Sequence, residues 1–559
     1  MVKLGMSSHQ FISFSLTYDN PKKVTAKGGR EYLDELLPIL KELNVRYLYC
    51  TDGNYFKLLT KCKKAEPNYG YVLDCAIEGY TDMKVVLSTN HRGLFINDKL
   101  QDKIDLANYK LVEHKLGNYQ EIGTNIIKHA EYIPADPVRI KEALDRLHQY
   151  DSITCDTETF SLKHTRAGLG TIGFAWSENE GICIDIEHFS KTRGMGILKF
   201  KSTILSLLKE FFENYKGNVK YHNASYDIKI LIYLLWMDNL LDTAGLIKGL
   251  NVLTRNFDDT KIIAYLATNS CAENKLSLKD LAHEFAGNYA QSDINDITKI
   301  PNDKLMEYNL VDCLSTWFVF NKYYPIMLQD NQLHVYEFFK KILKNIIQME
   351  LTGMPINMQR VLEVKAEISG IVDKYRKVLN ESPLMKKFTL ATRQKLYEEK
   401  QASLKQKIIT IDDIKYEFNT NSNKQLIELL HEFFGFEVFS TTDTGQPAVG
   451  SDELKGHIGR TENQEIKDIL KAIIKIQEGE KILGTFISKF EEAELGPDGW
   501  YYLFGSLNLG SVVSGRLSSS NPNLQNLPSG SSYGKLVKSC FQAPPGWLFC
   551  GLDFNSLIH

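Results

Sequence analysis

The stretch Ile153-Thr154-Cys155-Asp156-Thr157-Glu158-Thr159 joins an apolar run to two carboxylates that lie two positions apart. Its β-branched, apolar start predicts a strand, and alternate side chains of a strand point to the same face. Asp156 and Glu158 are therefore expected to leave one face together at the end of the strand, where they can share a metal ion. Alone, such a pair is more often an ordinary surface feature.

Two later segments add carboxylates in similar surroundings. The run Lys220-Tyr221-His222-Asn223-Ala224-Ser225-Tyr226-Asp227 ends a predicted strand and opens a helix, which places Asp227 one helical turn after Asn223. Further on, Tyr308 and Asp312 stand at positions i and i+4 and so share a helix face. A Tyr-x-x-x-Asp step alone is usually structural, but the three patterns in this order are harder to reach by accident.

These residue types suit the hydrolysis of a phosphodiester. That reaction needs an activated water and a neutralised leaving group, and two cations held by several carboxylates supply both. Mg²⁺ and Mn²⁺ prefer hard oxygen ligands, which matches three Asp and one Glu without His or Cys. Tyr308 is expected to orient the attacking water through a hydrogen bond.

The surrounding pattern predicts a central sheet flanked by helices between Asp151 and about Pro325. Predicted strands cover residues 170–176, 181–185 and 218–222, and predicted helices cover residues 201–214, 225–235, 276–285 and 303–324. Before Tyr132 the chain reads as α/β, with a helix at 32–40 and strands at 47–49 and 84–87. From Tyr336 to about Gly484 it reads as long helices, and beyond Trp500 it is rich in Gly, Ser, Asn and Pro.

The carboxylate segments resemble the DEDD exonucleases of the Tyr-bearing subtype, which include the proofreading domains of family A DNA polymerases and ribonuclease D-like enzymes. The resemblance implies a ribonuclease H-like sheet. It also implies that two Mg²⁺ or Mn²⁺ ions are held by Asp156, Glu158, Asp227 and Asp312, with Tyr308 as the water-orienting residue. Asn223 matches the polar residue of the second motif, which implies a contact with DNA.

Later segments resemble the family A polymerase domain. Residues 348–357, 418–426 and 444–448 are similar to its thumb, and Ser514-Gly515-Arg516-Leu517-Ser518-Ser519-Ser520-Asn521-Pro522-Asn523-Leu524-Gln525-Asn526-Leu527-Pro528 is similar to its primer-template-gripping motif. The residue types fit that role, because Arg516 supplies a bidentate cation. The amides of Asn523, Gln525 and Asn526 can bind minor-groove acceptors that every base pair presents.

Residues 532–541 resemble bacteriophage members of this family, and Trp547–Leu557 resembles an apolar palm strand whose Asp553 binds catalytic metals. Ile558 and His559 then depart from the family pattern, in which a Glu follows the strand. We therefore expect a palm that stops inside its first motif and a polypeptide that does not polymerise DNA by itself. An intron or inserted element, a frameshift, or a split enzyme with a complementing polymerase chain would each explain the ending.

The composition fits an α/β multidomain protein. The length of 559 residues predicts about three or four domains. The content of 43% hydrophobic and 24% charged residues is ordinary for a globular protein. We expect an N-terminal α/β domain of unknown role (1–135), a ribonuclease H-like exonuclease domain (136–330), a mainly helical thumb (331–505) and an incomplete palm (506–559). A net charge of −3 gives no overall basic footprint, so DNA binding must depend on local patches.

Neither a secretory signal nor a membrane span is evident, and the nine scattered cysteines include no Cys-x-x-Cys pair. The sequence thus predicts an intracellular protein, placed in the host cytoplasm if a phage encodes it. Its expected partners are a DNA primer-template and a single-stranded 3′ end, with deoxynucleotides only if the missing fingers and palm are supplied. The leading hypothesis is a replicative family A polymerase with proofreading. The alternatives are a stand-alone ribonuclease D-like exonuclease and a non-enzymatic DNA-binding protein.

Overall fold

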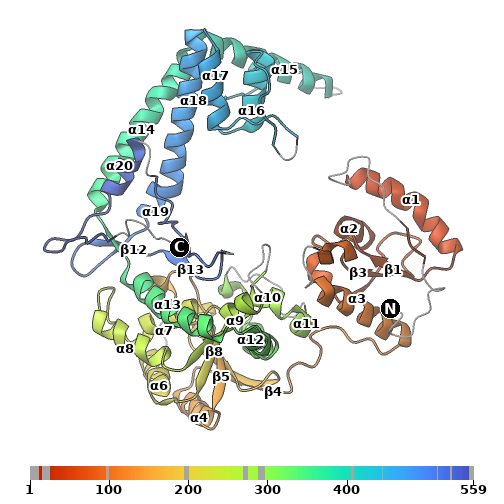
Figure 1. Cartoon of the computed structure of the whole chain (residues 1–559), viewed down its shortest axis with the longest axis vertical. Helices are drawn as coiled ribbons and strands as arrows, with labels where there is room; N and C mark the ends of the chain where they lie inside the picture. Colours follow the sequence, from red (N-terminus) through yellow and green to blue (C-terminus); the bar gives the residue numbers. More distant parts are fainter. Residues whose placement is uncertain are drawn as a thin grey trace. The chain divides into compact units, whose positions relative to one another are not determined.

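The computed structural model describes residues 12–14, 25–95, 100–193, 200–268, 275–287, 296–403, 408–442, 445–512, 514–528 and 532–552. The chain forms two compact units (Figure 1). The first unit comprises Met1–Asp238, Asp242–Gln348 and Leu509–Arg516, and the second comprises Asn239–Leu241, Met349–Asn508 and Leu517–His559. We describe each unit by itself.

The N-terminal part of the first unit is a three-stranded sheet with helices on both faces. Its strands, in the spatial order β1-β3-β2, are β1 (Tyr47–Cys50), β3 (Lys84–Leu87) and β2 (Val72–Asp74). Val85 packs in a cluster with residues of α1 (Ala26–Glu42) and α2 (Gly53–Thr60), whereas its neighbour Val86 packs against α3 (Leu100–Leu116). The alternation of side chains along β3 thus supplies both cores, and the helix and the two strands expected here are confirmed.

A six-stranded sheet forms the centre of the first unit, in the order β4-β7-β6-β5-β8-β9. Its strands are β4 (His129–Ile133), β5 (Ser152–Glu158), β6 (Thr171–Ala175), β7 (Glu180–Asp185), β8 (Asn218–Tyr221) and β9 (Phe257–Asp259). β6 runs antiparallel to β5 and β7, while the pairs β4–β7, β5–β8 and β8–β9 are parallel. β4 precedes Asp136, so this sheet begins upstream of the expected domain boundary.

Helices cover both faces of this sheet (Figure 1). Phe174 of β6 contacts Phe211 and Phe212 of α6 on one face. Ala175 packs on the other face with residues of α12, which contacts β5, β6 and β7. The helices of this part of the chain are α4 (Pro137–Leu147), α5 (His188–Thr192), α6 (Lys201–Asn214), α7 (Ala224–Leu235), α8 (Thr243–Leu253), α9 (Thr260–Ala267), α10 (Leu278–Leu281), α11 (His283–Ala286) and α12 (Asn302–Gln329).

The single helix expected over residues 276–285 was wrong. The chain forms two short helices there, α10 and α11, separated by Ala282, whose φ of −98° and ψ of 10° are not helical. Ser277 caps the first of them by accepting a hydrogen bond from the backbone N–H of Asp280. The break keeps Leu281 and Ala282 in a buried cluster with Val319 of α12.

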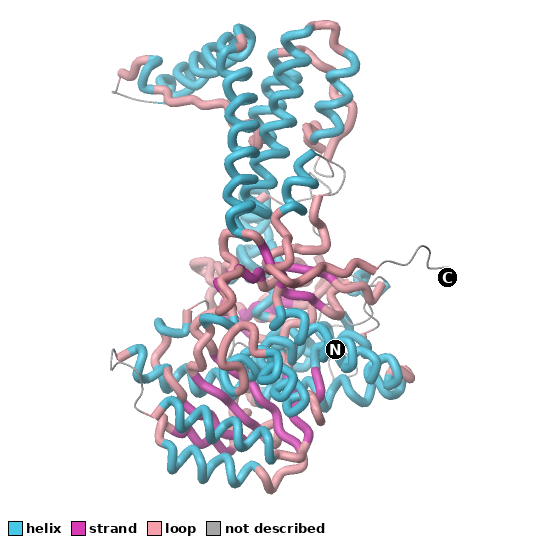
Figure 2. Tube along the Cα trace, turned by 90° about the vertical axis from the view of Figure 1, so that its left-hand side faces the viewer, coloured by secondary structure: helices cyan, strands magenta, loops and turns pink. Residues whose placement is uncertain are grey.

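The second unit is mainly helical, as the sequence predicts. Two long helices, α14 (Met358–Glu381) and α18 (Gln464–Ile482), lie side by side (Figures 1 and 2). A Cβ on Gly479 would lie 2.5 Å from Cγ2 of Val372, so the close approach of the two helices requires glycine. Most of α13 (Leu333–Thr352) belongs to the first unit, which extends to Gln348. The other α-helices described in the second unit are α15 (Pro383–Ser403), α16 (Asn423–Ile427), α17 (Ser451–Arg460), α19 (Ser488–Phe490) and α20 (Ser532–Ser539).

Two small antiparallel sheets complete the second unit. One has the order β10-β12-β11, and the other pairs β13 with β14. Their strands are β10 (Met354–Ile356), β11 (Glu494–Leu495), β12 (Tyr501–Leu503), β13 (Ser506–Asn508) and β14 (Ser518–Ser520).

The apolar strand expected to start at Trp547 was wrong for its described part. Residues 547–552 form no strand, and within the described ranges no neighbouring strand pairs with them. The backbone therefore lacks a partner for a hydrogen-bonded ladder. The large side chains of this run are exposed, as expected for an uncovered apolar patch: Trp547, Leu548, Phe549 and Leu552. Asp553 lies outside the described residues.

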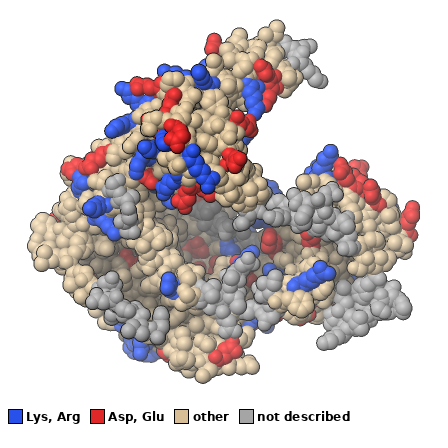
Figure 3. All heavy atoms as spheres, turned by 45° about the horizontal axis from the view of Figure 1, so that its top comes forward, with Lys and Arg blue, Asp and Glu red and all other residues tan. Residues whose placement is uncertain are grey.

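On the face drawn in Figure 3, basic and acidic side chains are interspersed, in line with the small net charge of −3. Within the described ranges, every helix is too short or too polar to traverse a lipid bilayer.

Candidate metal centre

Three carboxylates meet at the end of β5. Asp156 and Glu158 lie at alternate positions of this strand, and Asp312 comes from α12. Each of the three can offer one oxygen such that all of these oxygens lie within 4.8 Å of one another. The structure thus brings together three of the four carboxylates that the resemblance implies as metal ligands.

A glycine allows α12 to pack closely on the inner strand β6, beside β5. Gly173 of β6 pairs with Asp156 in the antiparallel ladder. A Cβ at this position would lie 2.7 Å from Sγ of Cys313 and 3.1 Å from Oδ1 of Asn309, both on α12. Any larger residue would displace the helix that carries Asp312.

Asp227 sits beside the cluster and is held by Thr157, the residue between the two strand carboxylates. The backbone N–H of Thr157 donates to Oδ1 of Asp227 at 3.0 Å, and the Thr157 hydroxyl donates to the same oxygen at 2.6 Å. Asp227 is not among the three carboxylates that lie within 4.8 Å of one another. Burial and then the charges of Asp156 and Asp312 raise the pKa of Glu158, and the charge of Asp227 adds to this effect.

Tyr308 lies one helical turn before Asp312 on α12. Burial first, and then the charges of Asp312 and Glu158, raise the pKa of the Tyr308 hydroxyl far above its usual value. The ammonium of Lys279, on α10, lies 5.3 Å from the centroid of the Tyr308 ring. A protonated phenol thus faces the carboxylates, with a cation over its ring.

The carboxylates are costly to ionise in this environment. Burial raises the pKa of Asp156 to about 6, although a hydrogen bond from Asn309 acts in the opposite direction. For Glu158 and Asp312, burial and then the charge of Asp156 raise the pKa, while Lys279 lowers it. Burial and Asp156 also raise the pKa of Asp227. Four carboxylates that are buried close together repel one another when ionised, so a nearby positive charge would stabilise their ionised forms.

A divalent cation fits this need. Oδ1 of Asp312 is buried without a hydrogen-bond partner in the described structure. Because buried polar atoms normally have a partner, a bound cation would satisfy this oxygen. The donor atoms are all carboxylate oxygens, the type that Mg²⁺ and Mn²⁺ prefer.

Asn223, predicted to contact DNA, occupies the N-terminus of α7 with a φ of 65°. Its side-chain oxygen accepts a hydrogen bond from Nζ of Lys261 at 3.1 Å. The backbone N–H groups of Asn223 and Ala224 donate to Asp259 at 3.1 and 2.9 Å. This turn sets the start of α7 and therefore the place of Asp227.

Sequence reasoning missed three residues of this centre. Thr157 and Asn309 stand inside the quoted patterns, but their types gave no reason to assign them a role. Lys279 is distant in the sequence from every carboxylate, and only the packing of α10 on α12 brings it near. Buried partners of this kind have no spacing signature of their own.

The other residues predicted to bind DNA stand on either side of β14 in the sequence. Arg516 is exposed and belongs to the first unit, while Asn523, Gln525 and Asn526 belong to the second. Oδ1 of Asn523 accepts a hydrogen bond from the backbone N–H of Asn526 at 3.2 Å, which fixes the turn between them. Gln525 and Asn526 are exposed, so their amides face solvent.

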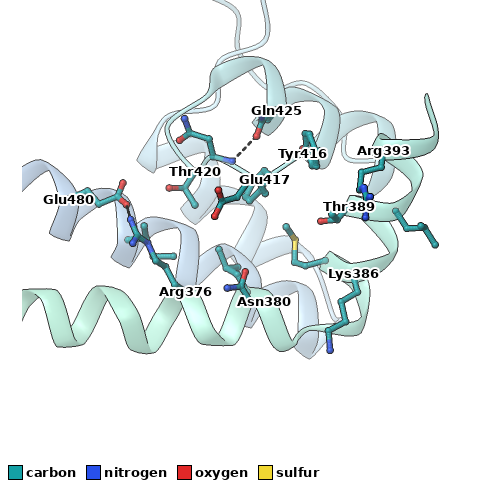
Figure 4. A pocket seen from close by; sticks show the side chains of 16 residues that line it. Arg376, Asn380, Lys386, Thr389, Arg393, Tyr416, Glu417, Thr420, Gln425 and Glu480 are labelled. Atoms are coloured by element: carbon teal, nitrogen blue, oxygen red, sulfur yellow. Dashed lines mark hydrogen bonds and ion pairs between the residues drawn. The ribbon is translucent and has the colours of Figure 1, made fainter. Parts of the chain in front are cut away.

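A pocket of about 890 Å³ opens in the second unit among α14, α15, α18 and residues 416–425 (Figure 4). Two of its cations are paired with protein groups. Arg376 forms an ion pair with Glu480, and Arg393 donates to the backbone carbonyls of Ile411 and Ile414 at 3.0 and 3.1 Å. The pocket belongs to a different unit from the carboxylate cluster.

The first unit thus contains a mixed sheet covered by helices, with a cluster of three carboxylates at the end of its inner strand β5. Two family models match the chain: 3′-5′ exonuclease over residues 133–327, and DNA polymerase family A over residues 387–557. The chain therefore carries a 3′-5′ exonuclease domain and a family A DNA polymerase domain.

Individual relatives agree with these matches. DNA polymerase I of Pseudomonas aeruginosa is 23% identical over 458 residues, which are 79% of this chain and 44% of that protein. The DNA polymerase of Bacillus phage SP01 is 24% identical over 486 residues, 82% of this chain and 48% of that protein. The chain thus spans less than half the length of these relatives. The POL domain of Pol1 from M. smegmatis, solved in complex with DNA primer-template and dNTP, aligns with a TM-score of 0.48 and 14% identity over 75% of this chain and 59% of that one.

Proposed function

We propose that this protein removes nucleotides from the 3′ end of DNA, as the proofreading activity of a family A DNA polymerase that acts in replication. The observation that carries the proposal is the cluster of Asp156, Glu158 and Asp312, with Tyr308 beside it, at the end of strand β5. This cluster lies within residues 133–327, which match the 3′-5′ exonuclease family model. The relatives of this chain are DNA polymerases, which supports DNA as the substrate.

In this proposal the centre takes two divalent ions, Mg²⁺ or Mn²⁺. Asp156, Glu158 and Asp312 hold one directly, and Asp227, kept in place by Thr157, completes the ligand set. Bound divalent cations supply an activated water and neutralise the leaving alkoxide. Tyr308 carries its proton at neutral pH, as an ordinary tyrosine does, and burial raises its pKa further, so its hydroxyl is able to orient the attacking water.

The polymerase domain would grip the primer-template with Arg516, Asn523, Gln525 and Asn526, and Asp553 would serve as its first palm carboxylate. A phage origin of this protein is supported by two similarities. Residues 532–541 resemble bacteriophage members of family A, and the chain is similar to the DNA polymerase of Bacillus phage SP01.

The test uses the full chain with 5′-labelled DNA in Mg²⁺. Shortening of a single strand from its 3′ end, and of a mismatched primer faster than of a matched one, is the expected result. The double variant Asp156→Ala, Glu158→Ala should lose this activity, while Glu142→Gln, an exposed change on α4, should keep it. Equal or faster cleavage of RNA would instead favour a ribonuclease, and cleavage that survives the double change would overturn the assignment of the site.

A further inference from the structure

Asn309 lies on α12 between Tyr308 and Asp312 and is completely buried. Its side-chain Nδ2 donates a hydrogen bond to Oδ2 of Asp156 at 2.5 Å. Its Oδ1 accepts from the hydroxyl of Thr171 at 3.2 Å and from the thiol of Cys183 at 3.3 Å. The amide thus ties Asp156 of β5 to residues of β6 and β7.

The chemistry of these partners fixes the orientation of the amide. An ionised carboxylate only accepts hydrogen bonds, so the NH₂ end of Asn309 must face Asp156. The oxygen then faces Thr171 and Cys183, which both have a hydrogen to donate. The flipped amide would set an oxygen against a carboxylate and would leave these donors without an acceptor.

Gly173 leaves the space that the amide of Asn309 occupies. Oδ1 of Asn309 lies 3.1 Å from the point where a Cβ of Gly173 would be, a distance tighter than an ordinary contact. Because no side chain occupies this point, the amide fits against the backbone of β6. The buried network of hydrogen bonds therefore holds one carboxylate oxygen of Asp156 in one place.

We propose that Asn309 is the positioning residue of the metal centre: by occupying Oδ2 of Asp156, it aims the other oxygen of that carboxylate at the cation and so sets the affinity for the metal. The inference rests on the proposed exonuclease function. It assigns Asn309 no contact with the substrate. Partners of this kind behind a ligand typically change metal affinity about 10- to 100-fold when they are lost.

The test measures metal binding directly, by titrating Mn²⁺ into the metal-free full chain in a calorimeter. Binding that disappears in Asp156→Ala is that of this centre. Asn309→Ala should weaken it about 10- to 100-fold. Thr171→Val, which removes one donor behind the amide, should weaken it less, and Thr171→Ser, which keeps the hydroxyl, should bind as the wild type does.

A second readout separates positioning from a loss of folding. Exonuclease activity of Asn309→Ala should fall at low Mn²⁺ and return toward the wild-type kcat as Mn²⁺ is raised, because the defect lies in metal affinity. Near-wild-type circular dichroism in chelator would accompany this result.

The proposal is overturned if folded Asn309→Ala binds Mn²⁺ as tightly as the wild type, or if added metal leaves its activity low. If Asn309→Ala fails to fold, the comparison of Thr171→Val with Thr171→Ser decides in the same way. Absence of exonuclease activity in the wild type would contradict the proposed function, whereas the binding titrations would still decide the role of Asn309.

Discussion

Replacing Asp156 by Asn should stabilise the metal-free protein while it destroys the metal centre. Burial raises the pKa of Asp156 in the folded state from 3.8 to about 6. A group with a raised folded pKa contributes its stability below its unfolded pKa, and that stability is lost as the pH rises through the folded pKa. Above pH 6, the ionised Asp156 therefore costs about 3 kcal/mol. Asn has nearly the same shape, carries no charge, and keeps an oxygen that can accept from Asn309.

The assay is urea-dependent hydrogen exchange of peptides that cover β5 and α12, in chelator, at pH 7.5 and at pH 4. At pH 7.5 the local unfolding free energy of Asp156→Asn should exceed that of the wild type by up to about 3 kcal/mol, and near pH 4 the two should agree. Saturating Mn²⁺ should narrow or reverse the difference, since metal at a hundred times its Kd stabilises the wild type by about 2.7 kcal/mol. Glu142→Gln serves as the control. A metal-free variant that is no more stable than the wild type at pH 7.5 would refute the reasoning.

Three other changes have defined outcomes. Thr157→Val removes the hydroxyl that donates to Asp227 at 2.6 Å and should lower the exchange-derived unfolding free energy by about 1–3 kcal/mol, whereas Thr157→Ser should not. Gly173→Ala overpacks against Sγ of Cys313 and should lower stability by about 1–3 kcal/mol, part of which Cys313→Ala should restore in a melting experiment. Burial lowers the pKa of His222 in the folded protein to about 3. The neutral imidazole therefore contributes its full stabilisation of the fold above about pH 6.5, and this contribution is lost as the pH falls toward 3. Denaturant titrations of His222→Gln should show a shallower acid decline, and an unchanged slope would contradict this assignment.

Local patterns were enough to place the carboxylates. The strand of Asp156 and Glu158, the helix start before Asp227, and the shared face of Tyr308 and Asp312 each follow from a periodicity of two or of about four residues. These rules act within one element, and the structure agrees with each of them. The convergence of β5 and α12 was inferred from the resemblance, since no local rule brings residues so distant in sequence together.

The misses share a physical cause, because each depends on what lies beside the segment in space. β4 is short and only partly buried, and its pairing with β7 is not visible in its own sequence. The run at Trp547 has the composition of a strand but no partner among the described strands, so composition alone misled the prediction. Lys279 acquires its place from the packing of α10 on α12.

The metal centre also depends on how α12 packs on the sheet. Tyr308, Asn309 and Asp312 all lie in its first half, and each faces β5 or the carboxylates of β5. Gly173 and Gly181 allow this helix to pack closely on the sheet. A Cβ on Gly173 would collide with Cys313 of α12, and a Cβ on Gly181 would collide with Leu310. The side chains that pack the helix and those that hold the carboxylates therefore alternate along the same turns. A substitution of Gly173, Gly181 or the α12 residues that contact them is then expected to change metal affinity as well as stability, because both depend on the distance between α12 and β5.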